Sequence, residues 1–213
     1  MERPKVIFFD AVGTLFGIRG SVGSVYSEVA QHFGVNTSAQ NLNEAFIQTF
    51  KAAEPLAFPE ATPAEIPELE FQWCEAITRT SFEKVGVVNH FSDFSAFFTQ
   101  LYHHFATAEP WYIYPDVFPR LKRWRDKGME LGIVSNFDSR LYAVLQTLEL
   151  KDFFSSITIS SAVGAAKPDA KIFAAALEKH HIFAHQGWHV GDSFKEDYQG
   201  ATAAGVRAFL LKR

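Results

Sequence analysis

Apolar residues run without interruption over Val6–Phe9 and end at a carboxylate, Asp10. A short, fully apolar run of this kind is typical of a strand that is buried on both faces, as in a parallel sheet. Segments of similar character predict further strands at 130–135, 156–160, 188–190 and 208–211. The intervals between them have helical periodicity and predict helices at 116–127, 141–148, 169–179 and 194–204. Because strands and helices alternate strictly, the fold class is α/β, with a doubly wound parallel sheet.

The stretch from 17 to 108 has a different pattern. Its apolar residues recur at helical spacing, and none of it predicts a convincing strand, although 85–88 is ambiguous. Ser38 is placed to cap one of the helices, and four prolines between 55 and 67 interrupt the pattern. We therefore predict two domains: an α/β core of residues 1–16 and 109–213, and an inserted all-helical cap of residues 17–108.

Composition and charge narrow the class of protein. The formal net charge of −4 provides no basic footprint for nucleic acid. Cys74 is the single cysteine, so no disulfide can form within the chain, which is typical of a reducing compartment. The apolar run near the N-terminus is far too short for a signal peptide or a membrane span. We expect a cytoplasmic protein with a small-molecule substrate and with neither a nucleic-acid nor a membrane partner.

Polar residues cluster just after the predicted strands and in one loop. They are Asp10, Ser135, Asn136, Lys167, Asp192 and Asp197. The carboxyl ends of parallel strands meet at one crevice, where open α/β sheets bind their ligands. Carboxylate oxygens of this kind suit Mg²⁺, whereas a lysine, a hydroxyl and strand-end amides suit a phosphate.

Each of these residues also has a structural interpretation. Asp10 alone fits a carboxylate that caps a turn equally well, and Lys167 alone fits a solvated loop lysine. Asp138 and Asp169 each precede a predicted helix, so we expect them to be N-caps rather than reactants. Only the combination of the residues favours a catalytic site.

The combination resembles the haloacid dehalogenase-like (HAD) hydrolase superfamily, and the resemblance covers nearly the whole chain. Its four motifs correspond, in order, to Asp10–Leu15, Ser135, Lys167–Asp169 and Gly191–Asp197. A helical insertion directly after the first motif is the cap placement of subfamily IA. The residues of the second and fourth motifs resemble those of the branch named after the rhythmically expressed gene 2 product of insects.

The resemblance implies a role for each matched residue. Asp10 would attack phosphorus and form an aspartyl phosphate. Ser135, helped by the amide of Asn136, would bind the transferred phosphoryl group, and Lys167 would neutralise the charge. The implied catalytic residues are thus Asp10, Ser135 and Lys167, and the implied phosphate-binding residues are Gly13, Thr14, Ser135, Asn136 and Lys167.

The implied cofactor is Mg²⁺. Its expected ligands are the side chains of Asp10, Asp192 and Asp197 and the backbone carbonyl of Val12. Together these roles predict a Mg²⁺-dependent phosphohydrolase that acts on a small phosphorylated metabolite.

Val12 departs from the family pattern. Phosphatases of the superfamily usually have a second aspartate at this position, which protonates the leaving alkoxide and then activates water. A valine can do neither, and general acid–base catalysis typically contributes ~10²–10⁴-fold. We expect slow turnover of ordinary alkyl esters.

Three other interpretations remain open at this point. Haloacid dehalogenases bind their substrate through a cap arginine, but no arginine occurs between Arg19 and Arg79. Phosphonoacetaldehyde hydrolase also has a small apolar residue two positions after the nucleophile and forms a Schiff base on a cap lysine, for which Lys51 is the candidate. The third interpretation is a protein that binds Mg²⁺ and phosphate without turnover and uses a cap face for a partner. That face would comprise Phe91, Phe94, Phe98 and Phe105.

The histidines predict no further site. The adjacent pairs 103–104 and 180–181 point to different faces of a helix, which is poor chelating geometry. We therefore expect no zinc site. His189 lies in the strand that leads to Asp192 and is expected to be a core residue.

Overall fold

The structure, a computed structural model, describes residues 3–213. It contains two compact units. An α/β unit comprises the described residues up to Gly17 together with Pro55–Ile66 and Ile113–Arg213. A helical unit comprises Ile18–Glu54 and Pro67–Tyr112.

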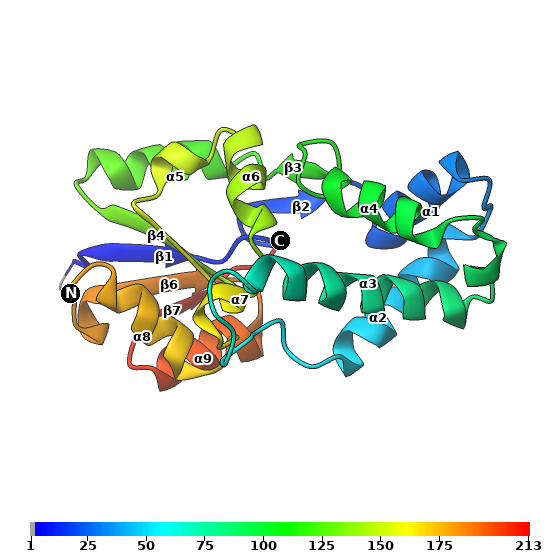
Figure 1. Cartoon of the computed structure of the whole chain (residues 1–213). Coiled ribbons are helices and arrows are strands. Elements are labelled where there is room, and N and C mark those ends of the chain that lie inside the picture. The colour runs from blue at the N-terminus through cyan, green and yellow to red at the C-terminus, as the bar shows by residue number, and fades with distance from the viewer. Residues whose placement is uncertain (1–2) are drawn as a thin grey trace. The chain divides into compact units, whose positions relative to one another are not determined.

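The α/β unit is built on a five-stranded parallel sheet, which confirms the predicted fold class (Figure 1). Its strands are β1 (Val6–Phe9), β4 (Glu130–Ser135), β5 (Ser156–Ile159), β6 (Gly187–Gly191) and β7 (Arg207–Leu210). They lie in the order β5-β4-β1-β6-β7, so the strand encoded first is the central one. The register places Phe8 of β1 between Gly132 of β4 and His189 of β6.

Helices cover both faces of the sheet. They are α5 (Val117–Asp126), α6 (Arg140–Thr147), α7 (Ser160–Val163), α8 (Ala170–Glu178) and α9 (Gly200–Ala203), with the short helices η2 (Lys151–Phe153), η3 (Ala184–Gln186) and η4 (Phe194–Gln199). Figure 1 shows α5 and α6 on one side of the sheet and α8 and α9 on the other. All four residues of β1 are buried, and each such side chain typically contributes about 1.5–3 kcal/mol. Burial on both faces explains the continuous apolar run in the sequence.

The strand order positions the candidate site. From β1 the chain builds outward through β4 and β5 on one side and through β6 and β7 on the other. The order therefore reverses at β1, and open α/β sheets bind ligands beside such a switch point, at the carboxyl ends of the strands. Asp10 follows the last residue of β1 directly.

His180 connects the amino ends of two neighbouring strands, at the opposite edge of the sheet from Asp10. Its Nδ1 lies 2.7 Å from Oε2 of Glu130 in β4, and its Nε2 lies 2.6 Å from Oγ of Ser156 in β5. Gly132 provides the space, because a Cβ there would lie 2.7 Å from the Ser156 hydroxyl oxygen. The contact thus joins the first residue of β4 to the first residue of β5, the outermost strand on this side of the sheet.

Two strands were not expected from the sequence. β2 (Phe16–Ile18) and β3 (Trp111–Ile113) form a separate two-stranded sheet. Each has three residues, which is too short for an alternating pattern to be visible, and their pairing joins segments more than ninety residues apart. The two segments contain two of the four points at which the chain passes from one unit to the other.

The helical unit contains α1 (Val22–His32), α2 (Ala39–Ala52), most of α3 (Ile66–Lys84), η1 (Val88–His90) and α4 (Phe94–His104). Ser38 caps α2 as predicted, since its side chain accepts the N–H of Asn41. The ambiguous segment 85–88 forms a turn that leads into η1.

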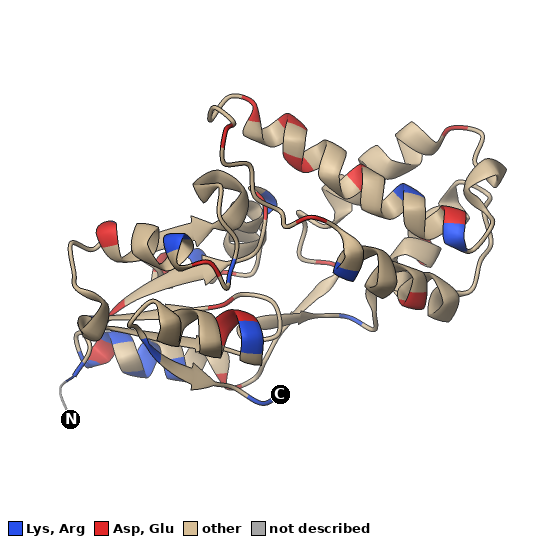
Figure 2. Ribbon diagram, turned by 90° about the horizontal axis from the view of Figure 1, so that it is seen from below, with Lys and Arg blue, Asp and Glu red and all other residues tan. Residues whose placement is uncertain are grey.

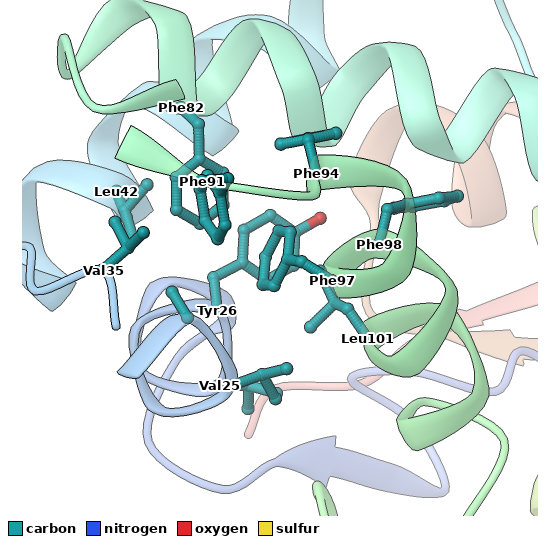
Figure 3. Packing of buried hydrophobic residues seen from close by; sticks show 12 residues of the cluster. Val25, Tyr26, Val35, Leu42, Phe82, Phe91, Phe94, Phe97, Phe98 and Leu101 are labelled. Atoms are coloured by element: carbon teal, nitrogen blue, oxygen red, sulfur yellow. The ribbon is translucent and has the colours of Figure 1, made fainter. Parts of the chain in front are cut away.

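Aromatic side chains form the core of the helical unit (Figure 3). Phe91, Phe94 and Phe98 are buried there, and Phe105 packs against the cluster. Phe91 stacks on Phe97 with ring centroids 4.4 Å apart, a geometry that adds to the free energy of burial. These side chains hold the helices together, so the partner face considered from the sequence is not formed by them.

The proline-rich segment 55–66 groups with the α/β unit, whereas the sequence had suggested that it lies within the helical domain. Gly164, after α7, approaches it closely, because a Cβ at Gly164 would lie 2.6 Å from the Cα of Pro59. A long-range backbone approach of this kind has no periodic signal in the sequence.

Lys, Arg, Asp and Glu all occur along the helices of the α/β unit in the view of Figure 2. Basic residues are frequent in α5, which contains Arg120, Lys122, Arg123 and Arg125. Among residues 3–213, no helix combines the length and the apolar character needed to cross a membrane.

Candidate active site

Asp10 is the centre of a group of side chains from different strands. It follows β1 and is only 7% exposed. Its Oδ1 accepts a hydrogen bond from the hydroxyl of Ser135 at the end of β4 (3.1 Å) and another from the ammonium of Lys167 (2.6 Å). The sheet thus brings together all three residues that the sequence singled out as catalytic.

Lys167 lies between two carboxylates in the interior of the α/β unit. Its Nζ is 2.6 Å from Oδ1 of Asp10 and 2.6 Å from Oδ1 of Asp197, and the side chain is fully buried. Burial opposes the charge on Lys167, but the two carboxylates outweigh it and hold the pKa of the ammonium above its usual range. Lys167 is therefore a permanently charged, fixed cation rather than a solvated loop lysine.

Asn136 fixes the backbone that carries this lysine. Its side-chain Oδ1 accepts the N–H of Lys167 at 2.7 Å, and its Nδ2 donates to the Lys167 carbonyl at 2.9 Å. The Asn136 amide thus satisfies both the backbone N–H and the backbone carbonyl of Lys167, as a neighbouring backbone segment otherwise would. Asn136 thus positions the Lys167 loop, and its predicted contact with a phosphate stays a prediction.

Asp197 accepts three hydrogen bonds. Lys167 and His189 donate to its Oδ1, and the backbone N–H of Ser193 donates to its Oδ2 at 2.9 Å. Burial works against ionisation, but the hydrogen bond from His189 and the charge of Lys167 outweigh it and hold the pKa of Asp197 well below its usual range. Asp197 belongs to η4, a π-helix, where the sequence had predicted an α-helix over 194–204. Such wide turns are common at functional sites.

His189 was expected to be a core residue, and it is fully buried in β6. Its Nε2 lies 2.8 Å from Oδ1 of Asp197, while its Nδ1 is buried with no hydrogen-bond partner among the described residues. Burial lowers the pKa of His189, so the ring is neutral and carries its proton on Nε2. The contact with Asp197 makes His189 a neighbour of the site that sequence reasoning missed. The one available signal was its place three residues before Asp192.

Asp192 is held near Asp10 by the loop that follows β1. The hydroxyl of Thr14 donates to its Oδ1 at 3.3 Å. Gly13 has a φ of 85° and contacts the same carboxylate, because a Cβ at this position would lie 2.4 Å from Oδ2 of Asp192. Gly13 and Thr14, predicted as phosphate-binding residues, are here the residues that hold Asp192.

Three carboxylates gather around this loop. One oxygen from each of Asp10, Asp192 and Asp197 lies within 4.8 Å of the other two. Burial raises the pKa of Asp192, and the negative charges of Asp10 and Asp197 raise it further. Such a group can hold a metal ion, since a divalent cation would relieve the repulsion among the carboxylates.

The side chain of Val12 has no titratable group and is 37% exposed. Its backbone bridges to Phe16 within the loop. The proposed metal contact of its carbonyl stays a prediction. Asp169 is the N-cap of α8 as expected, since its side chain accepts the N–H of Lys171. Asp138 is not the N-cap of α6, which is Ser139; its buried carboxylate instead pairs with the guanidinium of Arg140 at 2.6 Å.

The match to known proteins agrees with this arrangement. A family model described as haloacid dehalogenase-like hydrolase covers residues 4–205. The chain belongs to this hydrolase family. The residues gathered around Asp10 lie within the four motifs that the sequence predicted.

Relatives of this HAD-like hydrolase extend over nearly its whole length. Haloacid dehalogenase-like hydrolase domain-containing protein 3 of Bos taurus is 31% identical over 207 residues, which cover 97% of this chain and 81% of the relative. The rhythmically expressed gene 2 protein of Drosophila melanogaster is 26% identical over 99% of this chain and 84% of its own length, which confirms the predicted branch. The crystal structure of a HAD phosphatase from Thermococcus onnurineus has a TM-score of 0.65 at 22% identity. It aligns over 98% of this chain and 86% of that one, and so has the same fold.

Proposed function

We propose that this hydrolase is a Mg²⁺-dependent phosphohydrolase that acts on a small phosphorylated metabolite through an aspartyl phosphate on Asp10. The observation that carries the proposal is the pair of contacts to Oδ1 of Asp10. A hydroxyl and a fully buried ammonium meet there on one carboxylate oxygen. A nucleophile with a fixed cation beside it is the arrangement that phosphoryl transfer requires.

The two contacts support a division of roles within the carboxylate. Both hydrogen bonds recorded for Asp10 among the described side chains use Oδ1, so Oδ2 is the oxygen that we assign to attack on phosphorus. Lys167 then stabilises the charge on the transferred phosphoryl group without moving, since Asn136 and Asp197 fix its two ends. Preorganised charge of this kind is usually the largest contribution to catalysis.

The metal fits the donors that are present. Carboxylate oxygens are hard ligands that suit Mg²⁺, and Asp10, Asp192 and Asp197 supply one each. We assign the carbonyl of Val12 as a further ligand. A bound Mg²⁺ would neutralise negative charge on the phosphoryl oxygens and hold them beside Asp10.

The acidic group also favours phosphoryl transfer over dehalogenation. Displacement of halide by a carboxylate needs no metal, so Asp192 and Thr14 would have no part in it. A phosphate dianion, by contrast, needs positive charge on several sides, which Lys167 and a bound cation would provide.

A panel of phosphate esters tests the proposal directly. Purified protein is assayed with Mg²⁺, with chelator, and as the variant Asp10→Asn. We expect turnover of at least one ester with Mg²⁺ and loss of that turnover in both other arms. The proposal is wrong if no ester is hydrolysed, or if Asp10→Asn retains the wild-type rate.

Gly13→Ala tests the assigned position of Asp192. The new Cβ would collide with the Asp192 carboxylate, so we expect the affinity for Mg²⁺ to fall by about 10–100-fold, as for other residues that orient metal ligands. Gly128→Ala is the matched control, because Gly128 has a similar φ of 76° but an open environment. Isothermal titration calorimetry with Mg²⁺ measures both. Equal affinities in the two variants would contradict the assignment.

A further inference from the structure

The side chains around Asp10 stabilise negative charge, but they are poor proton donors, because the two carboxylates beside Lys167 raise its pKa and the Ser135 hydroxyl already donates its hydrogen. The hydroxyl of Ser135 donates to Asp10 Oδ1. The ammonium of Lys167 donates to Asp10 and to Asp197. None of these groups is arranged to give a proton to a departing oxygen.

The other polar neighbours with hydrogen bonds at this site are acceptors. Glu196, which precedes Asp197 in η4, is a further carboxylate nearby, and its side chain makes no hydrogen bond to another described residue, so it is tested as a donor below. Asp197 is fixed as an acceptor by three donors, and the Nε2–H of His189 is one of them. Asp192 accepts from Thr14 and belongs to the group of carboxylates assigned to Mg²⁺. Val12, two positions after Asp10, has a partly exposed side chain with no ionisable proton.

Resting on the proposed phosphohydrolase function, we infer that the site acts on aryl phosphate monoesters, whose leaving group departs as an anion without a proton. A phenol ionises with a pKa of about 10, as in tyrosine, whereas an alkanol resembles water at about 15.7. Phenolate is therefore a far better unprotonated leaving group than an alkoxide. A site that cannot donate a proton therefore favours aryl esters over alkyl esters.

The surface beside Asp192 is suited to the ring of such a substrate. Phe194 and Tyr198 of η4 stack on each other, with centroids 5.6 Å apart and planes 12° apart, and they are 57% and 39% exposed. Phe194 is two residues from Asp192, so their Cα atoms lie within about 7 Å. Gly13, next to Val12, also contacts the carboxylate of Asp192. Exposed aromatic surface thus lies close to this carboxylate in the chain, and rings pack favourably on such surface in stacked or edge-to-face geometry.

The reaction balances without an acid in its first step. Asp10 Oδ2 forms a bond to phosphorus while the bond from phosphorus to the aryl oxygen breaks, and the electron pair leaves with the phenolate. In the second step water attacks the aspartyl phosphate, the pair returns to Asp10, and the proton passes to solvent. Because Val12 cannot activate that water, we expect the second step to be slow and the phosphoenzyme to accumulate.

A leaving-group series measures the discrimination. The value of kcat/KM is determined with Mg²⁺ for p-nitrophenyl phosphate, phenyl phosphate and glycerol phosphate. We expect a steep fall across the series and a burst of about one p-nitrophenolate per active site. Equal values for the aryl and alkyl esters would overturn the inference and leave the phosphohydrolase function standing, whereas no turnover and no burst would overturn both.

Val12→Asp supplies the missing proton donor. We expect kcat/KM for glycerol phosphate to rise by about 10²–10⁴-fold and the burst to disappear, since the carboxyl also activates water. Val12→Asn is the matched control of the same shape and should produce neither change. An equal gain in both variants would contradict the inference, and so would a steeper series in Glu196→Gln, because Glu196 would then be the donor.

Phe194→Ala separates recognition of the ring from leaving-group chemistry. We expect KM for p-nitrophenyl phosphate to rise by about 2–10-fold with kcat unchanged. Acetyl phosphate, whose leaving group is equally free of a proton requirement but has no ring, should keep its KM. If acetyl phosphate is preferred to the aryl esters and Phe194→Ala changes neither KM, the assignment of aryl esters is wrong.

Discussion

Replacing Lys167 with methionine is expected to destabilise the protein and to abolish phosphoryl transfer. The ammonium is the shared partner of two largely buried carboxylates, Asp10 and Asp197. Removing one partner from a buried ionic group typically costs about 3–5 kcal/mol, because the remaining charges are left uncompensated. For a protein of this size the loss corresponds to a fall in Tm of about 6–20 °C. Turnover should fall by at least about 10²–10³-fold, as when one charge-stabilising donor is removed from an active site.

Lys171→Met is the matched control for this variant. Lys171 lies in the first turn of α8, four residues from Lys167, and is exposed. It should change neither Tm nor kcat/KM appreciably. Thermal unfolding and the ester assay are measured on the same preparations. If Lys167→Met unfolds at the wild-type temperature, the buried ionic group does not stabilise the fold as we describe.

Asp192→Asn is expected to change stability in the opposite direction while abolishing the response to Mg²⁺. Burial and the charges of Asp10 and Asp197 raise the pKa of Asp192, so its ionised form is unfavourable in the metal-free protein. A neutral amide removes that repulsion, and metal-free Asp192→Asn should unfold at a higher temperature than metal-free wild type. With Mg²⁺ at 100 times its Kd, wild type should gain about 2.7 kcal/mol, and the variant should gain little.

The raised pKa of Asp192 also predicts the sign of a pH effect. A carboxyl that binds its proton more tightly in the folded state stabilises the metal-free fold as pH falls through its pKa. Protons therefore compete with Mg²⁺, and the affinity for Mg²⁺ should decrease over the same range. Asp152→Asn, at an exposed carboxylate in η2, serves as the control. An unchanged Mg²⁺-induced shift in Asp192→Asn would contradict the assignment of Asp192 as a ligand.

Much of the α/β unit was predictable because its signals are local. The buried run that ends at Asp10 and the strict alternation of elements determine a parallel sheet, and a parallel sheet brings its strand ends together. Ser135, Lys167 and Asp192 could therefore be assigned to one site from their places along the chain.

The rest depended on contacts that have no local signal. Nothing in the sequence distinguishes a histidine that binds Asp197 from one that only packs, because both occupy a buried position in a strand. The pairing of β2 with β3 and the approach of Gly164 to Pro59 likewise join distant segments. The widening of the turn at 194–199 depends on how Asp197 meets Ser193 and Gly191, since a Cβ at Gly191 would lie 2.1 Å from the Asp197 carboxyl carbon.

The central position of β1 has a consequence for synthesis of the protein. Val6–Phe9 leaves the ribosome before its partner β4, which begins about 120 residues later. At a translation rate of 5–20 residues per second, this apolar strand waits roughly 6–24 s before it can pair. The helical unit, whose sequence lies almost entirely within that interval, can form its own aromatic core first. We expect the nascent chain to need a chaperone on its N-terminal strand during this time, and the nucleophile to be assembled last.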